Sequence, residues 1–268
     1  MQAMSALPPD AHIGEVSLTI ADLDRSVAFY TEVLGFELRD SESSRAALAP
    51  AGGRVLIRLT ELPGAGPRAR RTSGLYHFAV LVPDRAALGR SLRQLAARRW
   101  PLTGASDHLV SEALYLDDPD GLGIEIYRDR RRDEWTMEAG DVVMATEPLD
   151  LDAIAGTPGA EQPWTGLDAG TIMGHVHLHV PDLAAAEQRY CGDIGFTPML
   201  RRYPGALFVA AGEYHHHLGL NVWAGRGAPP PPPGTAGLSA FTIEARTLPP
   251  RELADEATGV TVQCVTTG

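Results

Sequence analysis

Residues 174–182 read GHVHLHVPD. Imidazoles alternate here with branched aliphatic side chains, a period of two that predicts a β-strand with His175, His177 and His179 on one face. A buried imidazole needs a hydrogen-bond partner or a metal ion, so three on one face indicate a metal site or an acid–base site. Taken alone, a strand whose polar face meets solvent explains the pattern equally well.

The same stretch begins a segment that occurs twice in the chain. Residues 13–36 read IGEVSLTIADLDRSVAFYTEVLGF, and residues 173–196 read MGHVHLHVPDLAAAEQRYCGDIGF, with matches at one constant offset. Each copy predicts a strand, an Asp at a helix N-cap and an amphipathic helix that ends at glycine. Similar beginnings occur at residues 75–84 and 238–243, so the chain is internally duplicated.

The repeating unit is a strand, a helix and three further strands, with starts near residues 14, 76, 174 and 239. We therefore predict an α+β fold of four tandem βαβββ units, of which the last is truncated. The predicted domains are a first pair of units over residues 1–139, a linker over 140–171 and a second pair over 172–268.

The fourth unit is short because only about 30 residues follow its start. It predicts a strand over residues 239–245, a short helix near 251–257 and a strand over 260–265, after a stiff proline spacer at Pro229–Pro233. A truncated unit leaves its partner with an open strand edge, which proteins rarely leave bare. We therefore expect a homodimer or larger assembly that covers this edge.

Composition limits the classes of partner. The chain carries 23 Lys and Arg against 34 Asp and Glu, a net charge of −11, which argues against nucleic-acid binding. No apolar run is long enough for a membrane span, and residues 1–12 have no signal-peptide character, so we expect a cytoplasmic protein. With only Cys191 and Cys264 for thiolates, any metal has to be held by imidazoles and carboxylates.

Three motifs together resemble the vicinal oxygen chelate superfamily, which includes glyoxalase I, bleomycin-resistance proteins and the type I extradiol dioxygenases. They are residues 22–36 (DLDRSVAFYTEVLGF), 118–127 (DPDGLGIEIY) and 174–180 (GHVHLHV). Residues 104–127 are most similar to the catechol 2,3-dioxygenase branch. The resemblance implies paired units that close curved mixed sheets around a central cavity. It also implies a metal-dependent, ring-cleaving extradiol dioxygenase acting on a small catechol-type aromatic and dioxygen.

In that superfamily the metal ligands lie on the first strand of each unit and near the last strand, and the extradiol enzymes hold Fe(II) with two His and one Glu. By position, the resemblance assigns this role to His77, Glu125 and His175. His77 stands seven residues before Asp84, just as His175 stands seven before Asp182. Glu125 lies between two isoleucines, so its carboxylate points away from them. Mn(II), Zn and Ni are the alternative metals.

The ligand set depends on which units pair. Pairing of the second and third units brings His175 to His77 and Glu125, and we favour it because imidazole suits iron better than a second carboxylate does. Pairing of the first and second units would make Glu15 the ligand in place of His175. Pairing of the third and fourth units offers only Ala240 where the second His is needed, which argues strongly against it.

Four further residues are candidates for catalysis: His108, Tyr115, His177 and His216. His177 lies on the predicted histidine face, where it would support the ligands or carry protons. By resemblance, His108 and Tyr115 match positions near the active site, and Tyr115 is a candidate hydrogen-bond donor to the substrate. The family's usual acid–base His aligns with Gly104, so its role would pass to His108 or to one ring of residues 215–217, here assigned to His216.

Two other functions fit the same fold. A glyoxalase-type lyase or isomerase would hold Zn or Ni with more carboxylates, and Asn221 at the position equivalent to Glu125 argues mildly against it. A metal-free protein of the bleomycin-resistance kind would use the same cavity to bind an aromatic ligand such as an antibiotic. Metal retained by the purified protein would distinguish an enzyme from such a binding protein.

Overall fold

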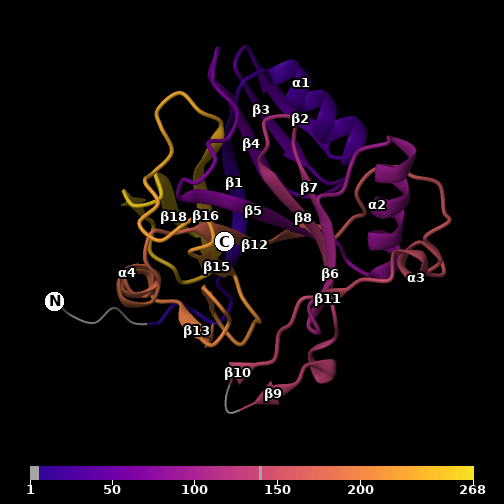
Figure 1. Cartoon of the computed structure of the whole chain (residues 1–268). Coiled ribbons are helices and arrows are strands. Elements are labelled where there is room, and N and C mark those ends of the chain that lie inside the picture. The colour runs from indigo at the N-terminus through magenta and orange to yellow at the C-terminus, as the bar shows by residue number, and fades with distance from the viewer. Residues whose placement is uncertain (1–5, 139–140) are drawn as a thin grey trace.

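The computed structural model describes residues 6–138 and 141–268, which build two curved sheets (Figure 1). Seven strands form the first sheet in this spatial order: β17 (Arg251–Asp255), β18 (Val260–Thr266), β16 (Gly237–Ala245), β1 (His12–Ile20), β4 (Ile57–Glu61), β3 (Arg45–Ala49) and β2 (Glu37–Glu42). The antiparallel pair β1 and β16 joins the first unit to the fourth. The α+β class predicted from the repeats is confirmed.

Nine strands form the second sheet in this order: β11 (Glu147–Pro148), β6 (Gly104–Asp107), β7 (Ser111–Asp117), β8 (Gly123–Asp129), β5 (Gly74–Leu81), β12 (Ile172–His179), β15 (Leu218–Asn221), β14 (Ala206–Ala210) and β13 (Thr197–Leu200). A small ribbon pairs β9 (Met137–Glu138) with β10 (Asp141–Val142). The antiparallel pair β5 and β12 joins the second unit to the third. The favoured pairing of these two units is therefore confirmed.

The histidine strand β12 is buried on both faces. Val176 and Leu178 belong to the hydrophobic core that fills the space between the sheets and their helices. On the other face, His175, His177 and His179 are 2%, 4% and 8% exposed. The alternative of a solvent-facing strand is therefore wrong, and three buried imidazoles have to be satisfied inside the protein.

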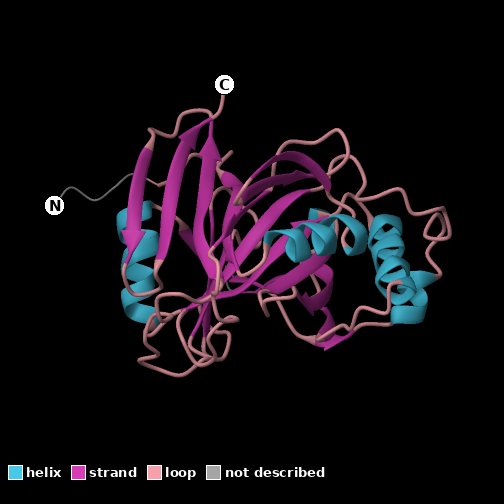
Figure 2. Cartoon of the chain, turned by 90° about the horizontal axis from the view of Figure 1, so that it is seen from above, coloured by secondary structure: helices cyan, strands magenta, loops and turns pink. Residues whose placement is uncertain are grey.

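The helices lie at the outside of the sheets, with α4 (Leu183–Glu187) at one end of the molecule and α2 (Arg85–Ala97) at the other (Figure 2). Both α4 and α1 (Leu23–Ala28) continue into a π-helical turn, and a 3₁₀ turn spans Arg132–Glu134. The carboxylates of Asp22, Asp84 and Asp182 cap α1, α2 and α4, as the repeat predicts. Within the described residues, no helix is long and apolar enough to cross a membrane.

The helix predicted near residues 251–257 is wrong, because strand β17 occupies this segment. It runs antiparallel to β18, with Arg251 opposite Cys264 and Asp255 opposite Val260. Since β16 covers only one edge of β18, a strand on the other edge makes backbone hydrogen bonds that a helix would leave unmade. The short turn between β17 and β18 is made possible by Gly259, whose φ is +73°. The fourth unit thus has three of the four strands of a unit and lacks its helix.

Residues 141–171 lie within the predicted linker and carry β10, β11 and the helix α3 (Leu151–Ala155). α3 packs against α2 at Gly89, where an added Cβ would lie only 2.6 Å from the carbonyl oxygen of Ile154. Asp168 pairs with Arg90 of α2 at 2.7 Å. This segment therefore folds onto the second unit. The division of the chain at residues 139/140 and 171/172 stays a prediction.

At Gly174 the side chain of Tyr127 lies directly against the backbone of β12. A Cβ on residue 174 would stand 1.9 Å from the Tyr127 hydroxyl, which is itself fixed by a 2.7 Å hydrogen bond with the Tyr214 hydroxyl. We expect Gly174→Ala to lower the free energy of unfolding by about 1–3 kcal/mol, as overpacking typically does. Chemical denaturation measures this change. Gly237→Ala on β16 is the control, since nothing lies within 4 Å of its Cβ, and an equal loss there would contradict this reasoning.

Candidate metal centre

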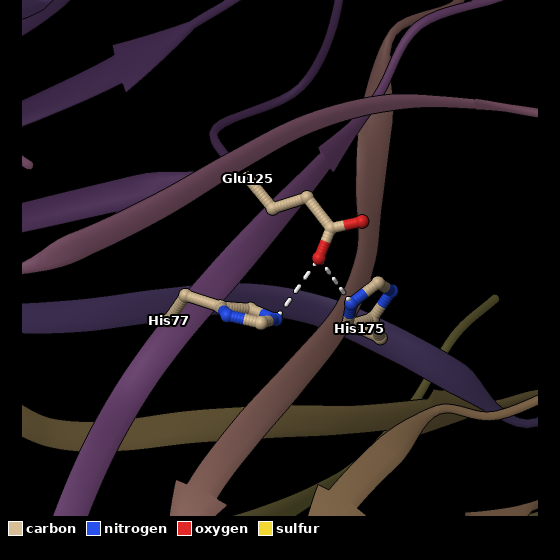
Figure 3. A group of neighbouring side chains, drawn as sticks. All are labelled: His77, Glu125 and His175. Carbon is tan, nitrogen blue, oxygen red and sulfur yellow. Dashed lines mark hydrogen bonds and ion pairs between the residues drawn. The ribbon is translucent and has the colours of Figure 1, made fainter. Parts of the chain in front are cut away.

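His77, Glu125 and His175 meet near the middle of the nine-stranded sheet (Figure 3). They stand on β5, β8 and β12, with β5 between the other two strands. Oε2 of Glu125 lies 2.9 Å from Nε2 of His77 and 3.1 Å from Nε2 of His175. All three side chains are buried. The structure therefore brings together the three residues that the resemblance assigns as ligands.

The strand register explains why these positions converge. Ala79 on β5 pairs with Glu125 of β8 and with His175 of β12. Paired residues in neighbouring strands point to the same face of the sheet, and His77, two residues before Ala79, shares that face. The methyl group of Ala79 leaves room between the carboxylate and the imidazole that flank it, and a larger side chain would fill that room.

The electrostatics of the cluster favour a charged carboxylate beside a neutral ring. Burial alone would raise the pKa of Glu125, but the imidazoles of His175 and His77 together hold it well below its usual range. Burial lowers the pKa of His175, although the neighbouring Glu125 opposes this. An ionised carboxylate and a neutral imidazole are the forms that bind metal ions, so the cluster needs no change of protonation to act as a ligand set.

Two observations fit a metal ion at this point. The buried Nε2 of His77 makes no hydrogen bond within the described residues, because its 2.9 Å contact with Glu125 is poorly aligned. Two ligand atoms about 2.1 Å from a metal ion and at right angles stand about 3.0 Å apart, and the observed distances are 2.9 and 3.1 Å. Among the described residues, no other group of three His, Cys, Asp or Glu side chains converges in this way.

The cluster forms part of the wall of a cavity of about 460 Å³. This volume lies within the range of about 300–1,000 Å³ that is typical of small-molecule sites. Two further groups of side chains line the same cavity, namely the hydrogen-bonding His108, Tyr115, His177 and His216, and the aromatic Tyr76, Tyr203, Phe208 and Trp223. All four residues predicted to be catalytic are thus placed together with the three candidate ligands.

His108 and Tyr115 form a hydrogen-bonded pair in the cavity wall. The Tyr115 hydroxyl lies 2.6 Å from Nε2 of His108, whose Nδ1 lies 2.7 Å from the carbonyl oxygen of Ala145. Because a carbonyl only accepts, Nδ1 carries the proton and Tyr115 donates to Nε2. Tyr115 stands opposite Glu125 across β7 and β8. Burial and this carboxylate raise the pKa of Tyr115 well above its usual range, so the phenol keeps its proton until Nε2 accepts it.

His177 brings a nitrogen without a partner to the cavity. Its Nε2 is buried and makes no hydrogen bond within the described residues, and burial holds the pKa of its ring well below the usual range. The ring centroid lies 5.0 Å from that of His77. The backbone of Gly219 on β15 makes room for the ring, since a Cβ there would lie 2.6 Å from it. A neutral imidazole with a free nitrogen is well placed to hydrogen-bond a bound ligand.

The histidines of residues 215–217 have three different environments. The ring of His216 lines the cavity and packs 4.2 Å from that of His175. His215 lies behind it, with Nδ1 2.8 Å from Nδ1 of His216 and Nε2 2.8 Å from Oδ1 of Asp129. Nδ1 of His217 accepts a backbone N–H and takes no part in the cavity wall. Asp129 therefore orients His216 through His215, a role that no local pattern at the end of β8 predicts.

His179 lies apart from the cluster although it belongs to the same strand. Its Nδ1 donates to Oδ1 of Asn221 at 2.6 Å, and burial lowers the pKa of its ring to about 4. The same Asn221 oxygen accepts the backbone N–H of Trp223 at 3.0 Å. β12 is irregular between His177 and Leu178 in its pairing with β5, so the predicted alternation does not carry His179 into the cavity wall.

The alternative ligand Glu15 is wrong, because it lies on β1 in the other sheet. Its Oε1 accepts a 2.7 Å hydrogen bond from Nε of Arg58 on β4. Arg58 on β4 pairs with Ser17 on β1, and Glu125 on β8 pairs with Ala79 on β5. Arg58 therefore holds in the first unit the position that Glu125 holds in the second. The equivalent point of the first sheet is thus occupied by an ion pair, and Glu15 does not belong to the group of converging ligand atoms.

Two comparisons with known sequences bear on the family of this chain. Residues 12–126 match the family model of the Glyoxalase/Bleomycin resistance protein/Dioxygenase superfamily. Over 244 residues the chain is 46% identical to the Catechol-2,3-dioxygenase of Bacillus subtilis (strain 168), covering 90% of this chain and 85% of that protein.

Solved structures show the same fold at low sequence identity. A putative dioxygenase from Bacillus subtilis subsp. subtilis str. 168 superposes with a TM-score of 0.64 at 14% identity, over 98% of this chain and 86% of that chain. Glyoxalase I from Zea mays superposes with a TM-score of 0.56 at 15% identity, over 96% and 92% of the two chains. At these identities the likeness concerns the fold alone, and the same fold serves different reactions.

Proposed function

Because this chain belongs to the glyoxalase/bleomycin resistance protein/dioxygenase superfamily, we propose that it is an extradiol dioxygenase that cleaves a catechol-type ring with dioxygen. The observation that carries the proposal is the buried cluster of two His and one Glu in the cavity wall. Such a donor set with open positions suits a non-haem Fe(II) centre, with Mn(II) as the alternative. The 46% identity to a catechol-2,3-dioxygenase supports the same activity.

When bound at His77, Glu125 and His175, Fe(II) supplies the redox chemistry between an aromatic diol and dioxygen. The chain itself supplies the proton transfer. A diol hydroxyl beside Tyr115 passes its proton to the phenol oxygen, while Tyr115 passes its own proton to Nε2 of His108. The hydrogen bond from Nδ1 of His108 to a carbonyl fixes the ring for this role.

The other wall residues position the diol and exclude water. In this proposal the free Nε2 of His177 hydrogen-bonds the second diol oxygen, in the direction that its neutral ring allows. His216 is held from behind by His215 and Asp129, and its ring covers one side of His175. Aromatic side chains around the remaining wall pack against the substrate ring and keep solvent away from the reacting atoms.

The donor set does not favour the glyoxalase-type alternative with Zn or Ni. That chemistry would need further carboxylate ligands near the cluster. Asn221, at the position equivalent to Glu125, hydrogen-bonds His179 and does not line the cavity. An extradiol dioxygenase, by contrast, needs no protein ligand beyond His77, Glu125 and His175.

A ring-fission assay tests the proposed function. The protein is loaded anaerobically with Fe(II), mixed with a panel of substituted catechols and then exposed to oxygen. We expect a yellow product and the uptake of one dioxygen per ring cleaved. Protein loaded with Zn(II), which has no redox chemistry, is the control and should give no colour. No product from any catechol with fully iron-loaded protein would contradict the proposal.

We also propose a homodimer that covers an open edge of the seven-stranded sheet. Its edge strands are β2 and β17. Among the described strands, β2 pairs only with β3 and β17 pairs only with β18, so each has one side without a neighbouring strand, and both carry charged side chains. Light scattering at micromolar concentration should give twice the chain mass of 28.7 kDa. The mass of a single chain would contradict the dimer.

A further inference from the structure

Arg68 brings a cation without a partner to the cavity of the candidate metal centre. Of the residues that the structure describes, it is the only Lys or Arg that lines this cavity. Among the described residues, none accepts a hydrogen bond from its guanidinium, and no carboxylate oxygen lies within 4.0 Å of it. Burying part of a charge without a partner costs free energy, and a bound ligand of opposite charge can offset this cost. The proposed ring-cleavage reaction makes no use of Arg68.

The backbone at Arg68 is anchored beside the cavity. Its N–H donates to the carbonyl oxygen of Asp120 at 2.9 Å, in the turn that precedes β8. At Gly121 of the same turn, an added Cβ would lie 3.9 Å from Cβ of Arg68. Burial lowers the pKa of Arg68, while Asp117 and Tyr76 oppose the shift. A guanidinium nevertheless stays protonated at neutral pH, so the cavity keeps one positive side chain.

Tyr76 connects the position of Arg68 to the candidate metal centre. Its ring lies 4.8 Å from the ring of His77 and 5.2 Å from that of His177. Arg68 is close enough to Tyr76 to act on its pKa, which burial raises and the guanidinium lowers. Arg68, Tyr76 and the histidines thus line one cavity, and a substituent on a ring bound at the histidines can extend within this cavity to Arg68. The cavity of about 460 Å³ is larger than a bare diol ring needs.

We infer that the substrate is a catechol with a carboxylate on a short side chain, and that Arg68 binds this carboxylate. This inference rests on the proposed function and adds the substrate class to it. The planar fork of a guanidinium matches both oxygens of a carboxylate. Asp117 also lines the cavity, and its charge opposes an anion. The carboxylate must therefore lie on the side of the guanidinium away from Asp117.

The test compares 3,4-dihydroxyphenylacetate with its amide, which has the same size and no charge. For the unaltered iron-loaded enzyme we expect kcat/KM to be at least about tenfold higher for the acid, as one charge-assisted hydrogen-bonded pair provides. Arg68→Gln should reduce this preference to about twofold, because kcat/KM should fall more for the acid than for the amide. Asp117→Asn should increase the preference. Equal rates for acid and amide, or an undiminished preference in Arg68→Gln, would overturn the inference.

A binding measurement separates this inference from the proposed reaction. Calorimetry with phenylacetate and phenylacetamide needs no ring cleavage, and the acid should bind more tightly to the unaltered protein than to Arg68→Gln. If no catechol is cleaved but this difference is found, the proposed reaction fails and the anion site stands. If catechols are cleaved but Arg68→Gln binds phenylacetate as well as the unaltered protein does, the reaction stands and the anion site fails.

Discussion

The His175→Ala variant should lose its bound iron. It removes one of three converging ligand atoms and leaves Glu125 and His77 to hold the ion alone, so we expect less than about a tenth of the iron per chain found in the unaltered protein. Ring cleavage should fall by about 1,000-fold or more, because the several kcal/mol contributed by the metal are lost. Elemental analysis and oxygen uptake measure the two losses.

Three matched variants show whether the loss is specific. Glu125→Gln keeps the size of the side chain and should also lose iron, because an amide binds metal more weakly than a carboxylate. His179→Ala removes a buried imidazole from the same strand but outside the cavity wall, so its iron content should be unchanged. Glu15→Ala should likewise keep its iron. Full iron in His175→Ala together with loss in Glu15→Ala would move the site to the first sheet.

The Tyr115→Phe variant should keep its iron and lose most of its turnover. Without the phenol hydroxyl, a diol proton has no path to Nε2 of His108, and a positioned proton carrier typically contributes about 100- to 10,000-fold. We expect kcat to fall by at least about 100-fold with a small change in KM. Tyr203→Phe is the control, since Tyr203 lines the same cavity but its hydroxyl bonds that of Thr146 at 2.7 Å.

A double variant tests whether Tyr115 and His108 act as one unit. If they do, His108→Ala should cost about as much as Tyr115→Phe, and the double variant should be no slower than the slower single one. If the fold-losses in kcat of the two single variants multiply in the double variant, the two residues act separately. An unchanged kcat in Tyr115→Phe would remove the pair from the proposed proton transfer.

The sequence alone predicts the units from periodic patterns, and it predicts the three candidate ligands from the positions that the family resemblance assigns. The alternation in residues 174–180 predicts the buried strand, and the match between residues 13–36 and 173–196 predicts the duplication. The preference for imidazole over Glu15 predicts which units pair, and the register confirms that pairing. Such alternating patterns are informative because a shift of one residue in a strand would turn every side chain to the opposite face of the sheet.

Other features depend on distant contacts and leave no local pattern. Residues 251–255 have a composition that suits a helix, but the open edge of β18 requires a strand. The partners Asp129 and His215 are 86 positions apart, and Glu15 and Arg58 are 43 apart. The missing partner of Arg68 is a property of the folded cavity alone. Only the assembled structure can show such pairs, or the absence of one.

Anomalous X-ray scattering tests most directly whether one iron ion is held by His77, Glu125 and His175. Crystals of the iron-loaded protein are measured on both sides of the iron absorption edge. We predict one strong difference peak within about 2.3 Å of Nε2 of His77, Oε2 of Glu125 and Nε2 of His175. The absence of a peak at these three atoms, or a peak held by other side chains, would contradict the claim.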